Sequence, residues 1–273
     1  MANYKIVASD LDGTLLDSHG KITAENLAAI SELSEKGIHF VPATGRSFVE
    51  IPDMIKSIPE IRYFIHSSGA VVYDKLTDER ISFCFPKELS AGLLNFLFGV
   101  DCHLTVRHLG KMYADKEKMN EESFAYHKMW EPHAALLRSV GEPVESFKER
   151  FTSVGDVEMI SVFIRDERVL EEVRARLSQF SDVNVASACP HNIELTYAKA
   201  GKGNALVALA ERLGVAVEQT IAVGDSENDM PMIQAAGLGL AMSNATDEIK
   251  ACADEIICSN DEHAVVFIVK SFL

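Results

Sequence analysis

The sequence predicts an α/β fold in which a core built on a parallel sheet is interrupted by an inserted α+β domain. Near both ends of the 273-residue chain, short apolar strands alternate with amphipathic helices, and the middle follows a different pattern. Alternating strands and helices indicate βαβ units, whose strands are parallel. The length suits one large domain or two ordinary ones.

The first elements of the predicted core lie before residue 70. Short apolar strands are expected at residues 4–9, 38–42 and 62–66. Apolar residues at helical spacing predict a helix between the first two strands, with Thr23 as its N-cap and Gly37 just after its end. A short helix is expected over residues 49–55.

The same alternation returns after residue 200. Strands are expected at residues 220–223, 238–242 and 255–257. A helix is predicted over residues 203–213, with Gly214 after its end, and Pro231 suits the first turn of another helix.

The middle of the chain, from about residue 83 to residue 190, indicates a separate domain. Residues 159–164 alternate as a half-buried strand does, and residues 166–180 form a clear amphipathic helix. We therefore expect a core from residues 1–83 and 191–273, with residues 84–190 inserted. Hinges between the two are expected near residues 82–86 and 188–191.

Composition excludes several classes of protein. The formal net charge is −15, which repels nucleic acid and anionic membranes, so we expect no partner of either kind. No apolar run approaches the roughly 20 residues of a membrane span. The N-terminus lacks a secretory pattern, and the five scattered cysteines suit reduced thiols, so a cytoplasmic location is expected.

The most informative segment is the run Ser-Asp-Leu-Asp-Gly-Thr that ends the first predicted strand. Asp10 and Asp12 lie two residues apart, so both carboxylates reach the space beyond the strand end. Crevices at the carboxyl ends of parallel strands are where open α/β sheets bind ligands. Two close carboxylates repel each other unless a proton or a cation intervenes, and Mg²⁺ prefers oxygen ligands.

Four polar stretches follow predicted core strands or begin core helices. They are Asp10–Thr14, Thr44–Arg46, Lys202–Gly203 and Gly224–Asp229. In a parallel sheet all four can meet in one crevice. Lys202 would supply there the positive charge that a phosphate needs and that the acidic chain lacks overall.

These stretches also carry the groups that phosphoryl transfer uses. Asp10 offers a nucleophilic carboxylate, and Asp12 offers a general acid and base. Thr44 and Gly45 offer a hydroxyl and an unobstructed amide for phosphate oxygens. Asp225, together with Asp229, offers further oxygen ligands for Mg²⁺.

The four stretches resemble, in order and spacing, the four signature motifs of the haloacid dehalogenase-like superfamily. The inserted middle is similar to that of its Cof-type phosphatases, which carry a large α/β cap between the second and third motifs. The resemblance covers the core at both ends, whereas over the middle it is one of length and general pattern. It implies a Rossmann-like core, an inserted cap that selects the substrate, and Mg²⁺-dependent hydrolysis of small phosphorylated metabolites such as sugar phosphates.

The resemblance also implies roles for the motif residues. Asp10 matches the nucleophile that forms the aspartyl-phosphate, and Asp12 matches the acid that protonates the leaving alcohol and then activates water. Lys202 matches the lysine that neutralises the nucleophile and the phosphate. Mg²⁺ would be held by the Asp10 carboxylate, the Asp12 main-chain carbonyl and Asp225.

The remaining motif residues are implied to bind phosphate or to support the site. Thr44, Gly45 and Asn228 would contact phosphoryl oxygens together with Lys202. Asp229 would support the shell, and Arg46 completes the second motif, where pairing with an acidic neighbour is the other interpretation.

Several points stay open at the level of sequence. Ser68 stands where such proteins often have Asn. Substrate selection would fall to cap residues, for which Arg107, His108, Lys111 and His191 are candidates. A phosphotransferase or phosphomutase on the same core, or a non-catalytic protein that binds a phosphorylated ligand, are the alternative functions. The oligomeric state cannot be read from the sequence.

Overall fold

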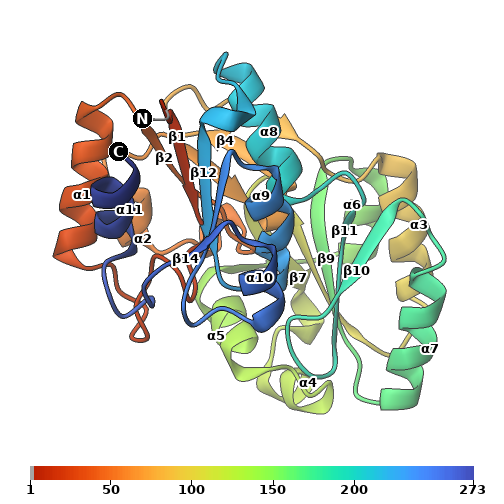
Figure 1. Cartoon of the computed structure of the whole chain (residues 1–273). Helices are drawn as coiled ribbons and strands as arrows, with labels where there is room; N and C mark the ends of the chain where they lie inside the picture. Colours follow the sequence, from red (N-terminus) through yellow and green to blue (C-terminus); the bar gives the residue numbers. More distant parts are fainter. Residues whose placement is uncertain (1–2) are drawn as a thin grey trace. The chain divides into compact units, whose positions relative to one another are not determined.

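The computed structural model describes residues 3–273, and the chain divides into two compact units (Figure 1). The first unit comprises Met1–Gly45, Asp53–Ile81 and Gly201–Leu273, and the second comprises Arg46–Pro52 and Ser82–Ala200. No helix in the described part of the chain is long and apolar enough to cross a membrane.

The first unit is organised by a five-stranded parallel sheet in the order β14-β13-β12-β1-β2. Its strands are β1 (Ile6–Ser9), β2 (His39–Pro42), β12 (Thr220–Gly224), β13 (Leu238–Ala241) and β14 (Glu255–Ile256). The chain places β2 on one side of β1, and it places β12, β13 and β14 on the other side. The strand order therefore reverses between β1 and β12, which is the point where open α/β sheets form their ligand crevice.

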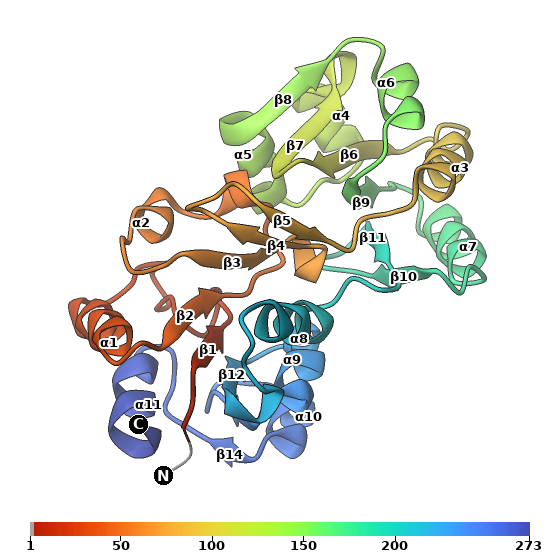
Figure 2. The ribbon, with the colours of Figure 1, turned by 90° about the horizontal axis from the view of Figure 1, so that it is seen from above.

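Helices cover both faces of this sheet. They are α1 (Ala24–Glu35), α2 (Asp53–Lys56), α8 (Lys202–Arg212), α9 (Met230–Ala235), α10 (Asp247–Cys252) and α11 (Ala264–Phe272). α1 and α11 lie side by side on one face, and α8 and α9 cover the other (Figure 2). Local sequence defines the ends of α1 as expected, because the Thr23 side chain accepts a hydrogen bond from the amide of Asn26 and Gly37 has a φ of +71°. The predicted Rossmann-like core is confirmed.

A small antiparallel sheet extends this core next to β2. It contains β3 (Tyr63–His66), β4 (Val71–Asp74) and β5 (Arg80–Ser82). The amide of Thr44 donates to the carbonyl of Ile65 at 2.9 Å, so the segment after β2 runs alongside β3.

The predicted helix over residues 49–55 is wrong. Residues Phe48–Glu50 form a 3₁₀ turn, and α2 begins only at Asp53. Between them Ile51 is extended, with φ −66° and ψ 131°, because Pro52 disfavours the helical conformation of the residue before it. The two pieces belong to different units.

The second unit contains a six-stranded sheet in the order β10-β11-β9-β6-β7-β8. Its strands are β6 (His103–His108), β7 (Lys111–Asp115), β8 (Gly141–Val144), β9 (Val157–Phe163), β10 (Val183–Ala186) and β11 (Asn192–Tyr197). Its pairings are antiparallel except for β7 with β8, which is parallel. All residues of β9 are buried, so both faces of this strand are covered by other parts of the unit and neither faces solvent.

The helices of the second unit pack on both sides of its sheet. They are α3 (Lys87–Leu97), α4 (Glu121–Tyr126), α5 (Glu131–Val140), α6 (Phe147–Ser153) and α7 (Glu167–Leu177). α3, α6 and α7 bury the larger apolar cluster against one face, whereas α4 and α5 pack against β7. The helix predicted over residues 166–180 is α7, and its N-cap Asp166 accepts hydrogen bonds from the amides of Arg168 and Val169.

The division into units differs from the boundaries expected from sequence in two respects. β11 pairs with β9 and β10, so residues 191–200 belong to the second unit rather than to the core. Residues 46–52 also belong to the second unit, although they follow β2.

Candidate functional site

The candidate site lies in the first unit, where β1 and β12 end beside each other. Asp10 follows β1 directly, and Asp225 follows β12. Their register pairs Ser9 with Val223, so Asp225 leaves the sheet within one residue of the level of Asp10. Parallel pairing thus brings together two acidic residues that are 215 positions apart in the sequence.

A buried lysine bridges two of the carboxylates at this edge. Lys202 Nζ donates to Asp10 Oδ1 and to Asp229 Oδ1, both at 2.6 Å, and all three side chains are buried. Lys202 is the first residue of α8, where the helix dipole disfavours a cation, so the two carboxylates must stabilise it there. Gly203 lets this helix end approach α9, because a Cβ there would lie 2.3 Å from the Pro231 carbonyl.

Burial and charge perturb the ionisation of these groups. Burial raises the pKa of Asp10 to about 8, with Asp229 and Asp225 adding to the shift and Lys202 opposing it. Burial would lower the pKa of Lys202, but Asp10 and Asp229 raise it above its ordinary value. The lysine therefore stays charged, and a cation placed beside the carboxylates would favour their charged forms.

Asp225 is fixed by the turn that follows Asp10. Thr14 Oγ1 donates to Asp225 Oδ1 at 2.9 Å. Gly13 has a φ of +78°, and a Cβ there would lie 2.5 Å from Asp225 Oδ2, so only glycine suits this position. Burial raises the pKa of Asp225. Sequence reasoning gave Thr14 no role, although its place directly after Asp12-Gly13 was the available signal.

Asp229 uses both of its oxygens within the protein. Oδ1 accepts from Lys202, and Oδ2 accepts from the amides of Asp225 and Ser226 at 3.1 Å each. Gly224 leaves room for it, because a Cβ there would lie 2.4 Å from Asp229 Cβ. Asp229 therefore holds the lysine and the turn after β12 in place.

The acidic cluster has the chemistry of a cation site. Asp10, Asp225 and Asp229 each offer a carboxylate oxygen, and these oxygens lie within 4.8 Å of one another. Hard divalent cations such as Mg²⁺ prefer such oxygen ligands, so the donor set fits the expected metal. Asp12 lies at the same turn with an exposed side chain.

Three polar residues, Thr44, Ser68 and Asn228, lie close to Gly45. A Cβ on Gly45 would lie 3.4 Å from Ser68 Oγ and 3.6 Å from Asn228 Nδ2. Asn228 Oδ1 accepts from Lys202 Nζ at 3.3 Å, which links this group to the buried lysine. Thr44 joins the same group, because its carbonyl accepts from the amide of Ser68 at 3.1 Å. Ser68 has a φ of +55°, an uncommon left-handed conformation for a residue other than glycine.

Arg46, the remaining residue of the second motif, belongs to the second unit. There its Nη1 donates to the carbonyl of Glu50 at 3.1 Å. Among the candidates for substrate selection, Arg107 is buried and bonded to Glu50 and Ser161, whereas Lys111 forms an exposed pair with Glu142. The Arg107 side chain therefore has an internal structural partner.

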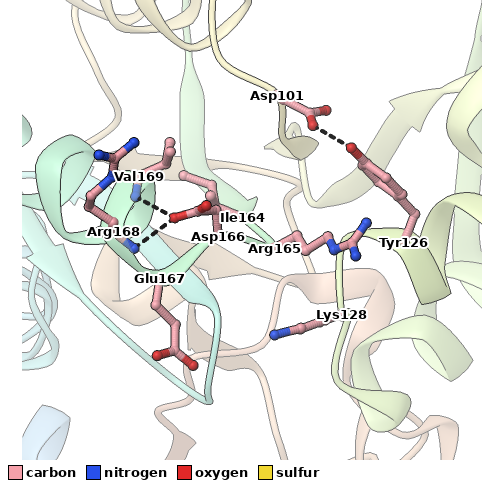
Figure 3. A pocket seen from close by; sticks show the side chains of 9 residues that line it. All are labelled: Asp101, Tyr126, Lys128, Ile164, Arg165, Asp166, Glu167, Arg168 and Val169. Atoms are coloured by element: carbon pink, nitrogen blue, oxygen red, sulfur yellow. Dashed lines mark hydrogen bonds between the residues drawn. The ribbon is translucent and has the colours of Figure 1, made fainter.

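A surface cavity of about 700 Å³ lies in the second unit at the N-terminus of α7 (Figure 3). Its charged lining residues are Lys128, Arg165, Arg168, Asp101, Asp166 and Glu167. The three cations are balanced by three carboxylates, and Asp166 already accepts from two amides at the helix start. The cavity thus lacks the concentrated positive charge of a phosphate site.

Together, the fold and the site define an α/β protein with an acidic, lysine-containing centre at the switch point of its parallel sheet. The sequence model of the haloacid dehalogenase-like hydrolases matches residues 7–269, and the chain belongs to this family. Two relatives that match over the full length are named phosphatases, and the chain is a phosphatase of this family.

Named relatives and solved structures agree with this assignment. The chain is 31% identical to phosphatase YwpJ of Bacillus subtilis, with 98% of the chain and 100% of the relative covered. It is 30% identical to 5-amino-6-(5-phospho-D-ribitylamino)uracil phosphatase YcsE of Bacillus subtilis, with 99% and 96% covered. The crystal structure of TM0651 from Thermotoga maritima is similar with a TM-score of 0.83 and 27% identity, covering 99% of this chain and 98% of that one.

Proposed function

We propose that the protein hydrolyses small phosphorylated metabolites with Mg²⁺, through an aspartyl-phosphate on Asp10. The observation that carries this proposal is the buried Asp10–Lys202–Asp229 arrangement beside Asp225 at the end of β1 and β12. A carboxylate nucleophile, a fixed cation and oxygen ligands for a metal are the parts that such a reaction needs.

In the proposed first step, an Asp10 carboxylate oxygen attacks the phosphorus, and the bond from phosphorus to the alcohol oxygen breaks. Asp12 gives its proton to the departing alcohol oxygen. In the second step, Asp12 takes a proton from a water molecule whose oxygen attacks the phosphorus. The bond from phosphorus to Asp10 then breaks, and inorganic phosphate leaves while Asp10 is restored.

The other residues hold charge and position. Lys202 keeps the Asp10 carboxylate oriented and offsets the negative charge of the phosphoryl group. Thr44, Gly45 and Asn228 are proposed to donate to the phosphoryl oxygens. Asp10, Asp225 and the main-chain carbonyl of Asp12 would hold Mg²⁺, which offsets charge on the transferred group when bound.

The second unit is proposed to be the domain that selects the substrate. It is inserted between the Thr44-Gly45 segment and Lys202, and it carries its own sheet and apolar clusters. The substrates to try first are sugar phosphates and 5-amino-6-(5-phospho-D-ribitylamino)uracil, because a relative with 30% identity is named for the latter.

The test is inorganic phosphate release from a panel of phosphorylated metabolites, with Mg²⁺ and with a chelator. Asp10→Asn removes the nucleophile, and Asp53→Asn, at a carboxylate with 98% exposure in the same unit, is the matched control. We expect release that needs Mg²⁺, is unchanged in Asp53→Asn and falls on the order of 10³-fold or more in Asp10→Asn. Release that persists in Asp10→Asn contradicts the mechanism, and substrate loss without equivalent phosphate indicates transfer to another hydroxyl.

A further inference from the structure

The loop after β13 is hydrogen-bonded to the main chain at Asp225. The amide of Met242 donates to the carbonyl of Gly224, and the amide of Thr246 donates to the carbonyl of Asp225, each at 3.1 Å. This loop is therefore fixed to the chain immediately on both sides of the Asp225 side chain. Asn244 lies between these two anchors.

The Asn244 side chain joins that loop to the turn after Asp10. Its Nδ2 donates to the carbonyl of Gly13 at 2.8 Å, and its Oδ1 accepts from the amide of Asn260 at 2.9 Å. Asn260 in turn donates from Nδ2 to the carbonyl of Leu16 at 3.0 Å. Two asparagines from the loops after β13 and β14 thus bind main-chain carbonyls of one turn.

These contacts close a ring of hydrogen bonds around Asp225. From the Asp225 main chain the ring runs through the loop to Asn244, on to the Gly13 carbonyl, and back through Thr14 Oγ1 to Asp225 Oδ1. A Cβ on Gly13 would lie 2.5 Å from Asp225 Oδ2, so the Gly13 main chain packs closely against that carboxylate. A displacement of the Gly13 main chain would therefore move the Asp225 carboxylate. The Gly13 peptide also directly follows the Asp12 carbonyl.

We propose that Asn244 is a positioning residue that fixes the Gly13 peptide and thereby orients Asp225 and the Asp12 carbonyl toward a divalent cation. The inference rests on the cation site of the proposed function and extends it to a residue without a carboxylate. Asn244 is exposed, so its hydrogen bonds add little to the stability of the fold itself. Its effect should therefore appear in cation binding rather than in folding.

The test compares Asn244→Ala and Asn244→Asp in the full chain, with Ser243→Ala as the matched control. The Ser243 hydroxyl lies in the same exposed loop and has no hydrogen-bond partner among residues 3–273. Two quantities are measured: the rise in Tm caused by Mg²⁺ without substrate, and the Mg²⁺ concentration for half-maximal phosphate release. Asn244→Asp keeps the acceptor for Asn260 and removes the donor to Gly13.

We expect both Asn244 variants to need roughly 10-fold or more Mg²⁺ for the same rise in Tm and for half-maximal phosphate release. The loss of a residue that hydrogen-bonds to the metal-binding groups typically weakens metal binding by about 10–100-fold. Their metal-free Tm should stay close to that of the unchanged chain, and Ser243→Ala should match it throughout. Wild-type Mg²⁺ dependence in Asn244→Ala overturns the inference. Tighter Mg²⁺ binding in Asn244→Asp does so too, because charge rather than the Gly13 hydrogen bond would then govern the site.

The two proposals fail in different ways. Stabilisation of the unchanged chain by Mg²⁺ without any phosphate release overturns the proposed hydrolysis and leaves the Asn244 comparison decisive through Tm. Absence of stabilisation by Mg²⁺ in the unchanged chain overturns the role of Asn244 together with the cation site.

Discussion

Removing the Glu50 carboxylate should strongly destabilise the second unit. Glu50 and Arg107 are each 4% exposed and form a bidentate ion pair, with Arg107 Nε on Glu50 Oε2 and Nη2 on Oε1, both at 3.0 Å. Oε2 also accepts from the amide of Ser47. Burial would raise the pKa of Glu50, but Arg107 lowers it below its ordinary value.

The size of the loss in stability follows from the contacts that remain after Glu50→Gln. Both carboxylate oxygens face donors, so the amide group of Gln must point its own donors at Ser47 or at Arg107. The Arg107 guanidinium keeps Ser161 Oγ at 2.7 Å and the attraction of Glu194 and Glu158, but it loses its bidentate carboxylate partner in a buried setting. Breaking a buried pair in this way costs about 3–5 kcal/mol. With an m-value of about 2 kcal/mol/M, the urea midpoint should fall by roughly 2 M.

The single tryptophan makes the assay specific for this unit. Trp130 caps α5, which packs beside β7 and the Phe48–Glu50 turn, so its fluorescence follows unfolding of the second unit. Glu142→Gln is the matched control, because its pair with Lys111 is about half exposed and is screened by solvent.

A second variant separates lost charge pairing from lost packing. Replacing the pair together, with Glu50→Leu and Arg107→Met, removes the unpaired charge, so stability should recover in part, although the Ser47 amide still lacks its acceptor. The reasoning is refuted if Glu50→Gln lowers the free energy of unfolding no more than Glu142→Gln does.

Two further predictions concern the turn after Asp10 and the buried histidines. Gly13→Ala places a Cβ 2.5 Å from Asp225 Oδ2 at a φ of +78°, so phosphate release should fall about 10²-fold, whereas Gly20→Ala, at a φ of +71° with open space around it, should retain activity. Equal activity of the two variants would contradict the packing argument. Burial lowers the pKa of His133 to about 3, so the second unit loses stability as the pH falls from about 6.5 toward 3, by up to about 1.4 kcal/mol per pH unit. The free energy of unfolding is measured with urea at pH 6 and at pH 4. Its loss between these two pH values should be smaller in His133→Phe than in the unchanged chain. An equal loss in the two proteins would show that this ring does not titrate as argued.

The core of the fold and the acidic residues of the site could be read from local sequence. Asp10 and Asp225 directly follow strands of four and five mostly apolar residues, and the parallel arrangement of such strands brings their carboxyl ends to one edge. Lys202 was identified as the positive charge of the crevice, and its ammonium group lies 2.6 Å from Asp10.

Other features depend on partners that periodicity does not reveal. One helix was expected over residues 49–55, but Pro52 divides this segment. Glu50 is held in the second unit by Arg107, 57 residues away. Arg107 resembled a substrate-selecting residue because a sequence gives no measure of burial. Asn244 carried no signal at all, since its function depends on a carbonyl more than 200 residues distant.

The sequence by itself determined the alternation of strands and helices, the reaction class that the motif residues imply and the placement of those residues at strand ends. These properties follow from local periodicity and residue chemistry, which act over a few neighbouring positions. Only the tertiary structure decided which carboxylate oxygens accept hydrogen bonds within the protein and to which unit residues 46–52 belong. It also decided how Asn244 links the turn after β1 with the loops after β13 and β14. Such choices arise from hydrogen bonds and ion pairs between distant segments, and their geometry exists only once the chain has folded.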